Sequence, residues 1–256
     1  PTPQEPVDLG IFGGSGFYSF VDGLTPRPVE TPYGPTSTTP MVGTVDGRRV
    51  AFIARHGEGH TLPAHRVNFR ANVWAMAALG ARAVIAPFAC GSLRREIGIG
   101  DLVIVDQLVD RTSGRDGTFF DGPETVHLQF GDPYDARIGA QIADEAEALG
   151  HRIHRGGTVV VISGPRFSTR AESRWHAAQG WDLVNMTQAP EIALVREAGM
   201  AAVGLGIVTD YDAGLEGEPD IEPVTGEQVL AYLRHNAEVL RDVLRTSIGS
   251  LTLPER

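Results

Sequence analysis

The chain has 256 residues and a formal net charge of −10, and this acidic charge argues against nucleic acid or an acidic membrane as a partner. All 22 basic residues are arginines, which excludes a Schiff-base lysine and the lysine of a P-loop. One cysteine rules out an internal disulfide framework, and no apolar run is long enough to span a bilayer, so we expect a cytoplasmic protein with no membrane partner.

The first third of the chain alternates apolar β-rich runs with a helical pattern. Residues 7–13 predict a buried strand. Residues 41–57 predict a hairpin with Asp46-Gly47 as its tight turn. Residues 68–80 have helical spacing and end at a glycine, as helices often do.

The rest of the chain continues the alternation. Strands are expected over residues 83–92, 100–110, 157–165, 182–186 and 201–210, and helices over 135–150, 170–180, 190–199 and 225–251. Proline at position 190 suits the start of its helix. The pattern predicts an α/β fold in one domain, residues 1–256: a three-layer sandwich with a mostly parallel or mixed central sheet and helices on both faces.

Distinctive polar segments follow several predicted strands. Ligands bind at the carboxyl ends of strands in such sheets, so these segments predict one site. They read GGSG, RHGEGH, SGPRFSTRAES, NMTQAPE and TDYD in chain order.

The GGSG segment follows the first strand and suits an anion. It is not a dinucleotide fingerprint, because Ser19 occupies the third glycine position, and it is not a nucleophile elbow, because Phe17 stands where glycine is needed. Its N–H groups and the Ser15 hydroxyl can still face an anion. The alternative is a plain turn.

Arg55 and His56 close the predicted hairpin. Arginine can hold phosphate bidentately, and the alternative for a lone arginine is a solvated surface residue. We expect no metal at His56, His60 and His65, because no cysteine pair or carboxylate spacing supports a zinc site. Cys90 is expected to be a small buried residue rather than a nucleophile.

Asp210 and Asp212 emerge from the last apolar strand. Desolvation there raises the pKa of a carboxyl group, which suits a general acid, whereas an Asx turn or a helix cap is the stronger alternative for Asp212. Phe167 could stack on a flat ring or fill the core. Met186 could lie against a sugar, and Thr187 offers a hydroxyl and an N–H.

Together these segments resemble the purine nucleoside phosphorylase superfamily, in its trimeric 5′-methylthioadenosine phosphorylase branch. The resemblance runs from about Leu9 to about Ile248. It is carried in order by GIFGGSGFY, TPYG, ARHGEGHTLPAHRVNFRAN, ACGSLR, GDLVIVDQLVDRT, GPRFSTRAES, NMTQAPE and TDYD.

The resemblance implies an enzyme, a pentosyltransferase, in which orthophosphate attacks C1′ of a nucleoside. It assigns phosphate binding to Ser15, Arg55, His56, Thr187 and the backbone at Ala89. It assigns ribose contacts to Met186 and, from a neighbouring subunit, His127. It assigns the purine to Phe167, Ser168, Asp212 and Asp210, with Asp210 as the acid facing N7.

The resemblance also implies phosphate as a co-substrate, no metal or organic cofactor, and a homotrimer or a dimer of trimers. TDYD favours adenine over hypoxanthine, because carboxylates accept from a 6-amino group. With the resemblance, the expected substrate is methylthioadenosine or a related 5′-deoxy-5′-substituted adenosine. The alternatives are a general or 6-oxopurine phosphorylase, a nucleosidase that uses water, and a non-catalytic sensor.

Two segments depart from the family pattern or lack a role in it. Phe88 stands where the branch usually has a phosphate-binding threonine, so one hydrogen bond to phosphate is expected to be missing. Residues 213–223 are rich in glycine, proline and acidic residues, and we expect a lid over the base there rather than a solvated loop.

Overall fold

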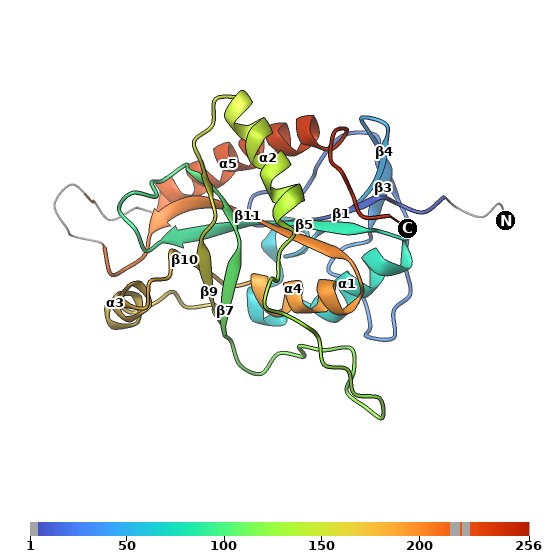
Figure 1. The fold of residues 1–256 in the computed structure, drawn as a ribbon, viewed down its shortest axis with the longest axis horizontal. Coiled ribbons are helices and arrows are strands. Elements are labelled where there is room, and N and C mark those ends of the chain that lie inside the picture. The colour runs from blue at the N-terminus through green and yellow to red at the C-terminus, as the bar shows by residue number, and fades with distance from the viewer. Residues whose placement is uncertain (1–4, 216–220, 222–225, 256) are drawn as a thin grey trace.

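The computed structural model describes residues 5–215, 221 and 226–255 (Figure 1). Its helices are α1 (Phe69–Ala78), α2 (Ala136–Ala148), α3 (Arg170–Ala178), α4 (Gln188–Glu197) and α5 (Gly226–Ser247). Its strands are β1 (Leu9–Gly13), β2 (Thr25–Pro26), β3 (Met41–Val45), β4 (Arg48–Ala54), β5 (Ala83–Ser92), β6 (Leu102–Val105), β7 (Gln107–Arg111), β8 (Ile153–Arg155), β9 (Thr158–Ile162), β10 (Leu183–Asn185) and β11 (Ala201–Tyr211).

All of these strands belong to one mixed sheet in which β5 is the central element. The main order is β2-β3-β4-β1-β5-β10-β9-β7, and β11 pairs with β5 and β6, with β8 beyond β6. The first residues of β5 pair with β1, whereas its last residues, Gly91 and Ser92, pair with β10. β11 runs parallel to β5 along its full length. β5 therefore connects the two halves of the sheet.

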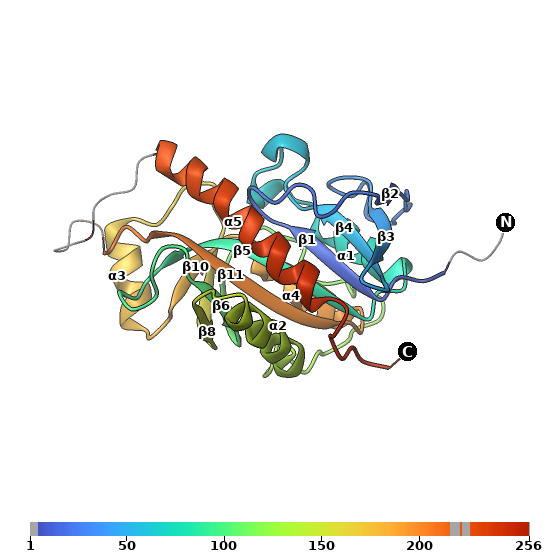
Figure 2. The same ribbon diagram turned by 90° about the horizontal axis from the view of Figure 1, so that it is seen from above.

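Helices cover both faces of the sheet, which confirms the three-layer α/β prediction. In Figure 1, α2 and α5 lie above the sheet, and α1 and α4 lie below it. Each pair of helices buries its apolar face in a separate core, one containing Met76 and Ile192 and the other Ile142 and Leu244. Figure 2 shows α5 crossing the sheet beside α2.

Local sequence signals explain several element boundaries. Asp46 and Gly47 have φ angles of 45° and 77°, the positive values that a tight hairpin turn of type I′ needs, so the predicted hairpin is confirmed. The side chain of Asp135 caps α2 by accepting from the Ile138 N–H. Ala189 is extended, with φ −112° and ψ 134°, and regular α4 geometry therefore begins at Pro190, as predicted.

The prediction of one buried strand over residues 100–110 is wrong. The run is divided at Asp106, whose carboxylate accepts a hydrogen bond from the Gly157 N–H at 3.2 Å. Before this point, β6 is buried between β11 and β8, whereas β7 lies at an edge of the sheet beside β9 and is partly exposed. An apolar run does not reveal such a change of partner.

Two further sequence predictions concern membrane spans and the lid. None of the helices in the described part of the chain combines the length and the apolar content that crossing a bilayer requires. Most of the segment expected to form a lid, residues 213–223, lies outside the described residues.

Candidate active site

The loop after β1 is shaped by glycines. A Cβ at Gly13 would lie 2.1 Å from the carbonyl oxygen of Phe17, which is closer than real Cβ atoms come. The Phe17 N–H donates to the Gly14 oxygen at 3.0 Å, and Gly16 has a φ of 80°. This turn leaves Ser15 half-buried at its corner, so its hydroxyl can face a ligand.

The same loop lies against Arg55 and β5. A Cβ at Gly14 would lie 3.3 Å from Arg55 Nη1 and 3.0 Å from the Pro87 oxygen. The Arg55 N–H donates to the Gly13 oxygen at 3.0 Å. Two segments that were expected to hold phosphate, Gly13–Ser15 and Arg55, are therefore in contact.

Arg55 is fully buried, so the solvated alternative is wrong for it. Its Nε and Nη2 donate to the two carboxylate oxygens of Glu191 at 2.6 and 2.7 Å, and its Nη1 donates to the Pro87 oxygen at 3.1 Å. A guanidinium has five N–H groups. Two of them, one on Nη1 and one on Nη2, therefore have no hydrogen-bond partner among the described residues, although the side chain as a whole is closed off from solvent.

His56 is a neutral imidazole beside this cation. Burial and the charge of Arg55 lower its pKa from 6.5 to about 3. Its Nδ1 lies 2.9 Å from the Leu62 carbonyl oxygen. A carbonyl only accepts, so Nδ1 carries the proton and Nε2 is an acceptor. His56 can thus accept the O–H of a hydrogen phosphate, but it supplies no positive charge.

The neighbouring histidines do not form a metal site with His56. The rings of His56 and His60 stack with centroids 4.3 Å apart, and Tyr18 Oη lies 3.2 Å from His60 Nδ1. His65 is exposed on a separate short turn. Among the residues that the structure describes, no three His, Cys, Asp or Glu side chains are grouped so as to hold a metal.

The lowered pKa of His56 makes stability depend on pH. The unfolded chain takes up a proton at this residue near pH 6.5, whereas the folded chain does so only near pH 3. The contribution of neutral His56 to the free energy of unfolding is complete above pH 6.5 and is lost as the pH falls toward 3. We expect the free energy of unfolding to drop by about 2 kcal/mol from this group between pH 7.5 and 5.

Urea unfolding at both pH values measures this drop, with His56→Gln as the variant that cannot titrate. The variant should lose less stability on acidification than the wild type, whereas exposed His65→Gln should behave as the wild type. Equal losses in the wild type and His56→Gln would contradict a buried neutral His56.

A buried asparagine that the sequence analysis did not identify shapes the turn between β10 and α4. Asn185 Oδ1 accepts from the backbone N–H groups of Thr187 and Gln188 at 2.7 and 2.8 Å, and its Nδ2 donates to the Ala89 oxygen at 3.2 Å. The expected Thr187 N–H is therefore already occupied, and the Thr187 hydroxyl makes only a long contact, 3.4 Å, to the same Asn185 oxygen. The signal was a polar residue ending an apolar strand.

Arg115 holds the Met186 loop in place and was also missed. It donates from Nη1 to the oxygens of Met186 and Ala189 at 2.8 and 2.6 Å, and from Nη2 to the Ser163 oxygen at 2.7 Å. The Met186 side chain lies over Gly164, where a Cβ would be 2.5 Å from its sulfur. Arg115 thus joins the loop after β10 to the loop after β9.

Asp210 lies near the end of β11, next to the last residues of β5. A Cβ at Gly91 would be 3.2 Å from Asp210 Oδ2, and the Thr209 hydroxyl donates to Asp210 Oδ1 at 2.6 Å. The pairing of β11 with β5 shifts register between Val208 and Asp210. Burial and the negative charge of Asp210 raise the pKa of the Cys90 thiol, which agrees with the prediction of an inert, buried cysteine.

Three buried polar atoms near α3 lack a protein partner. Ser168 Oγ, His176 Nδ1 and Asp212 Oδ2 make no hydrogen bond within the described part of the chain. The charge of Asp212 acts on His176, so the two side chains are close together. Buried polar groups are normally paired, so such atoms indicate a place for a polar ligand or water. His176 was not identified from the sequence.

The structure leaves Phe167 and His127 at the surface. Phe167 is 75% exposed, so the core alternative is wrong and its ring is available for stacking. His127 is exposed on the long segment between β7 and α2, which projects beyond α1 and α4 in Figure 1. No contact joins it to the other predicted residues of this chain among the described interactions.

Phe88 faces the core instead of the site. It is 1% exposed and pairs with Gly206 of β11, where a Cβ would lie 3.1 Å from the Phe88 ring. The glycine makes room for the ring. The position where relatives are expected to offer a hydroxyl therefore offers none.

β5 brings the predicted groups into one row. Pro87, Ala89 and Gly91 contact Arg55, the last residue of β10 and Asp210, in that order. Strand residues two apart are about 6.6 Å apart along the chain. An anion near Arg55 and an acid at Asp210 are therefore separated by the length of a small ligand.

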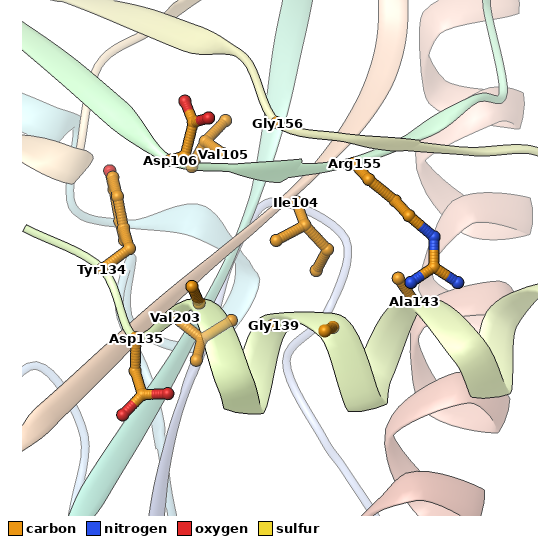
Figure 3. A pocket seen from close by; sticks show the side chains of 12 residues that line it. Ile104, Val105, Asp106, Tyr134, Asp135, Gly139, Ala143, Arg155, Gly156 and Val203 are labelled. Atoms are coloured by element: carbon orange, nitrogen blue, oxygen red, sulfur yellow. The ribbon is translucent and has the colours of Figure 1, made fainter. Parts of the chain in front are cut away.

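A separate hollow of about 200 Å³ lies between α2 and strands β6 and β8 (Figure 3). Its floor is apolar, and Asp106 and Arg155 lie at its rim. Arg155 is already paired with Asp144 and Glu147. None of the predicted site residues lines this hollow, and it lacks the chemistry gathered along β5.

Comparisons with known proteins support one family. The model described as Phosphorylase superfamily matches residues 8–249. A purine nucleoside phosphorylase of Streptomyces coelicolor is 48% identical over 253 residues, which cover 96% of this chain and 89% of that protein. An S-methyl-5′-thioadenosine phosphorylase of Mycolicibacterium smegmatis is 52% identical over 210 residues, 81% of this chain and 78% of that protein.

Solved structures agree with this assignment. The methylthioadenosine phosphorylase of Schistosoma mansoni in complex with tubercidin has a TM-score of 0.87 at 34% identity, covering 95% of this chain and 90% of that one. The family model spans nearly the whole chain, and the relatives match most of its length at high identity. The chain belongs to the phosphorylase superfamily.

Proposed function

We propose that the chain catalyses phosphorolysis of S-methyl-5′-thioadenosine to adenine and 5-methylthioribose 1-phosphate. The observation that carries this proposal is the row along β5, which places a buried cation with two unpartnered N–H groups on one side and a carboxyl group on the other. The names of the relatives from M. smegmatis and S. mansoni support the same substrate.

Phosphate binds between the loop after β1 and the turn after β10. Arg55 supplies its two unpartnered N–H groups, Ser15 and Thr187 supply hydroxyls, and the backbone at Ala89 completes the cradle. His56 Nε2 accepts the O–H of hydrogen phosphate. Breaking the glycosidic bond builds positive charge on the sugar, and the anion below C1′ stabilises that charge.

The purine leaves toward α3 and the end of β11. Phe167 stacks on the ring, and the ring edge pairs with the unpartnered atoms of Ser168 and Asp212. A phosphate oxygen forms a bond to C1′ while the bond from C1′ to N9 breaks. The electron pair passes into the imidazole ring, and Asp210, protonated at that step, gives its proton to N7.

The sugar lies between these two parts of the site. Met186 packs against the ribose, and His127 reaches it from a neighbouring copy in a homotrimer or a dimer of trimers. Inorganic phosphate is the co-substrate, and the reaction needs no organic cofactor or metal because attack and protonation use only phosphate and side chains. We place the enzyme in the cytoplasm.

A second candidate is a general or 6-oxopurine nucleoside phosphorylase. The purine nucleoside phosphorylase of S. coelicolor favours it, at 48% identity. The carboxylate of Asp212 disfavours it, because an ionised carboxyl group accepts from a 6-amino group and repels a 6-oxo group.

Initial rates on methylthioadenosine, adenosine and inosine, with and without phosphate, test the proposal. We expect turnover to require phosphate and kcat/KM for methylthioadenosine to exceed that for inosine at least about tenfold, the value of one mismatched hydrogen bond. Preference for inosine would support the second candidate. Equal turnover without phosphate would indicate a nucleosidase, and binding without products a sensor.

A further inference from the structure

Glu191 is a fully buried carboxylate for which the proposed reaction has no direct use. It lies on α4, directly after Pro190, and buried apolar residues such as Ile192 and Leu194 follow it in the helix. Both of its oxygens accept from Arg55, at 2.6 and 2.7 Å. Burying an ionised carboxylate is costly, so its presence indicates a specific task.

The contacts of Glu191 fix the orientation of the guanidinium. Together they occupy the N–H of Nε and one N–H of Nη2, so the guanidinium plane cannot turn. Without them, the guanidinium would keep the hydrogen bond from Nη1 to the Pro87 oxygen and its place 5.9 Å from the centroid of the Phe12 ring, and neither contact fixes the direction of Nη2. The start of α4 is itself fixed, because Arg115 donates to the Ala189 oxygen at 2.6 Å.

We infer that Glu191 is a positioning residue that aims the two unpartnered N–H groups of Arg55 at phosphate; this rests on the proposed function. Glu191 has two opposing effects on an incoming anion. Its orientation of Arg55 strengthens binding, and its negative charge weakens binding. The inference states that orientation has the larger effect.

Titration of the protein with inorganic phosphate by calorimetry separates the two effects. Glu191→Gln removes the charge and one of the two acceptors, and we expect phosphate affinity to fall at least about tenfold, as for a lost charge-assisted hydrogen bond. Glu191→Asp keeps the charge but shortens the reach, and it should lose affinity as well. Unchanged or tighter binding in Glu191→Gln, or wild-type binding in Glu191→Asp, would overturn the inference.

Glu147→Gln is the matched control. Glu147 accepts from Nε and Nη2 of Arg155 with the same two-point geometry, at 3.0 and 2.8 Å, but on the surface. This variant should bind phosphate as the wild type does. In steady-state kinetics, Glu191→Gln should raise KM for phosphate about tenfold or more and change KM for the nucleoside far less. General destabilisation of the protein would not change one KM and spare the other.

Wild-type crystals grown with and without phosphate provide a test that does not need a variant to fold. The Arg55 guanidinium should stay on Glu191 in both, and a guanidinium that leaves Glu191 to reach phosphate would overturn the inference. Failure of the proposed function is distinguishable from this result. A protein that binds phosphate but does not cleave nucleosides contradicts only the function, whereas one that binds no phosphate contradicts both.

Discussion

Asp210→Asn is expected to lower kcat for phosphorolysis of methylthioadenosine by about 10² to 10⁴-fold, the usual contribution of a general acid. The amide keeps the shape of the carboxyl group and can still accept the hydrogen bond from Thr209, which lies at 2.6 Å in the wild type. It has no proton to give to purine N7. Steady-state rates at saturating phosphate measure the effect, and thermal unfolding checks that the fold is retained.

A substrate whose purine needs no protonation distinguishes the general-acid role of Asp210 from its other roles. A 7-methylated purine nucleoside already carries positive charge on the imidazole ring, so the loss caused by Asp210→Asn should be at least about tenfold smaller with it. Asp135→Asn serves as a control, because asparagine also caps helices and Asp135 lies at the start of α2. Near-normal turnover by Asp210→Asn on methylthioadenosine would remove Asp210 from the acid role.

Arg55→Leu is expected to cost about 3–5 kcal/mol of unfolding free energy, because it leaves the carboxylate of Glu191 buried and unpaired. The double variant Arg55→Leu with Glu191→Leu should be more stable than Arg55→Leu alone, because both charges are then absent. Urea unfolding of the wild type, both single variants and the double variant measures the coupling.

The surface pair of Arg155 and Glu147 provides the comparison. Arg155→Leu should leave the unfolding free energy close to that of the wild type, because the pair is exposed to solvent. If the loss of unfolding free energy in the double variant equalled the sum of the losses in the two single variants, Arg55 and Glu191 would not be energetically coupled. The unpaired Glu191 would then not be the cause of the instability of Arg55→Leu.

The sequence was most informative where local signals act within a few residues. Asp46-Gly47 specified a hairpin turn, and Pro190 marked the regular start of α4, because backbone geometry at these positions depends on the residue itself. The division of the run at Asp106 was not predicted, because apolar residues continue on both sides of it, and the two strands differ chiefly in their partners, β11 and β9.

Partners distant in sequence account for most of what was missed in the site. Glu191 lies 136 residues from Arg55, and Asn185 lies 96 residues from Ala89, so no local pattern joins them. The sequence nevertheless contained a sign that Glu191 and Asn185 have buried partners. Both are polar residues in apolar segments, and a buried charge or amide requires a partner. The occupied N–H of Thr187 could be found only once that partner was placed.

The central position of β5 has a consequence for how this protein can diverge. From Pro87 to Gly91 the strand advances roughly 13 Å at 3.3 Å per residue, and this covalent length sets the gap between Arg55, at the end of the site proposed for phosphate, and Asp210, at the end proposed for the purine. Loops at either end can acquire new side chains and change which nucleoside is accepted. A residue inserted into or deleted from this strand would instead alter the gap itself, so we expect substrate choice to drift among descendants while the length of β5 stays constant.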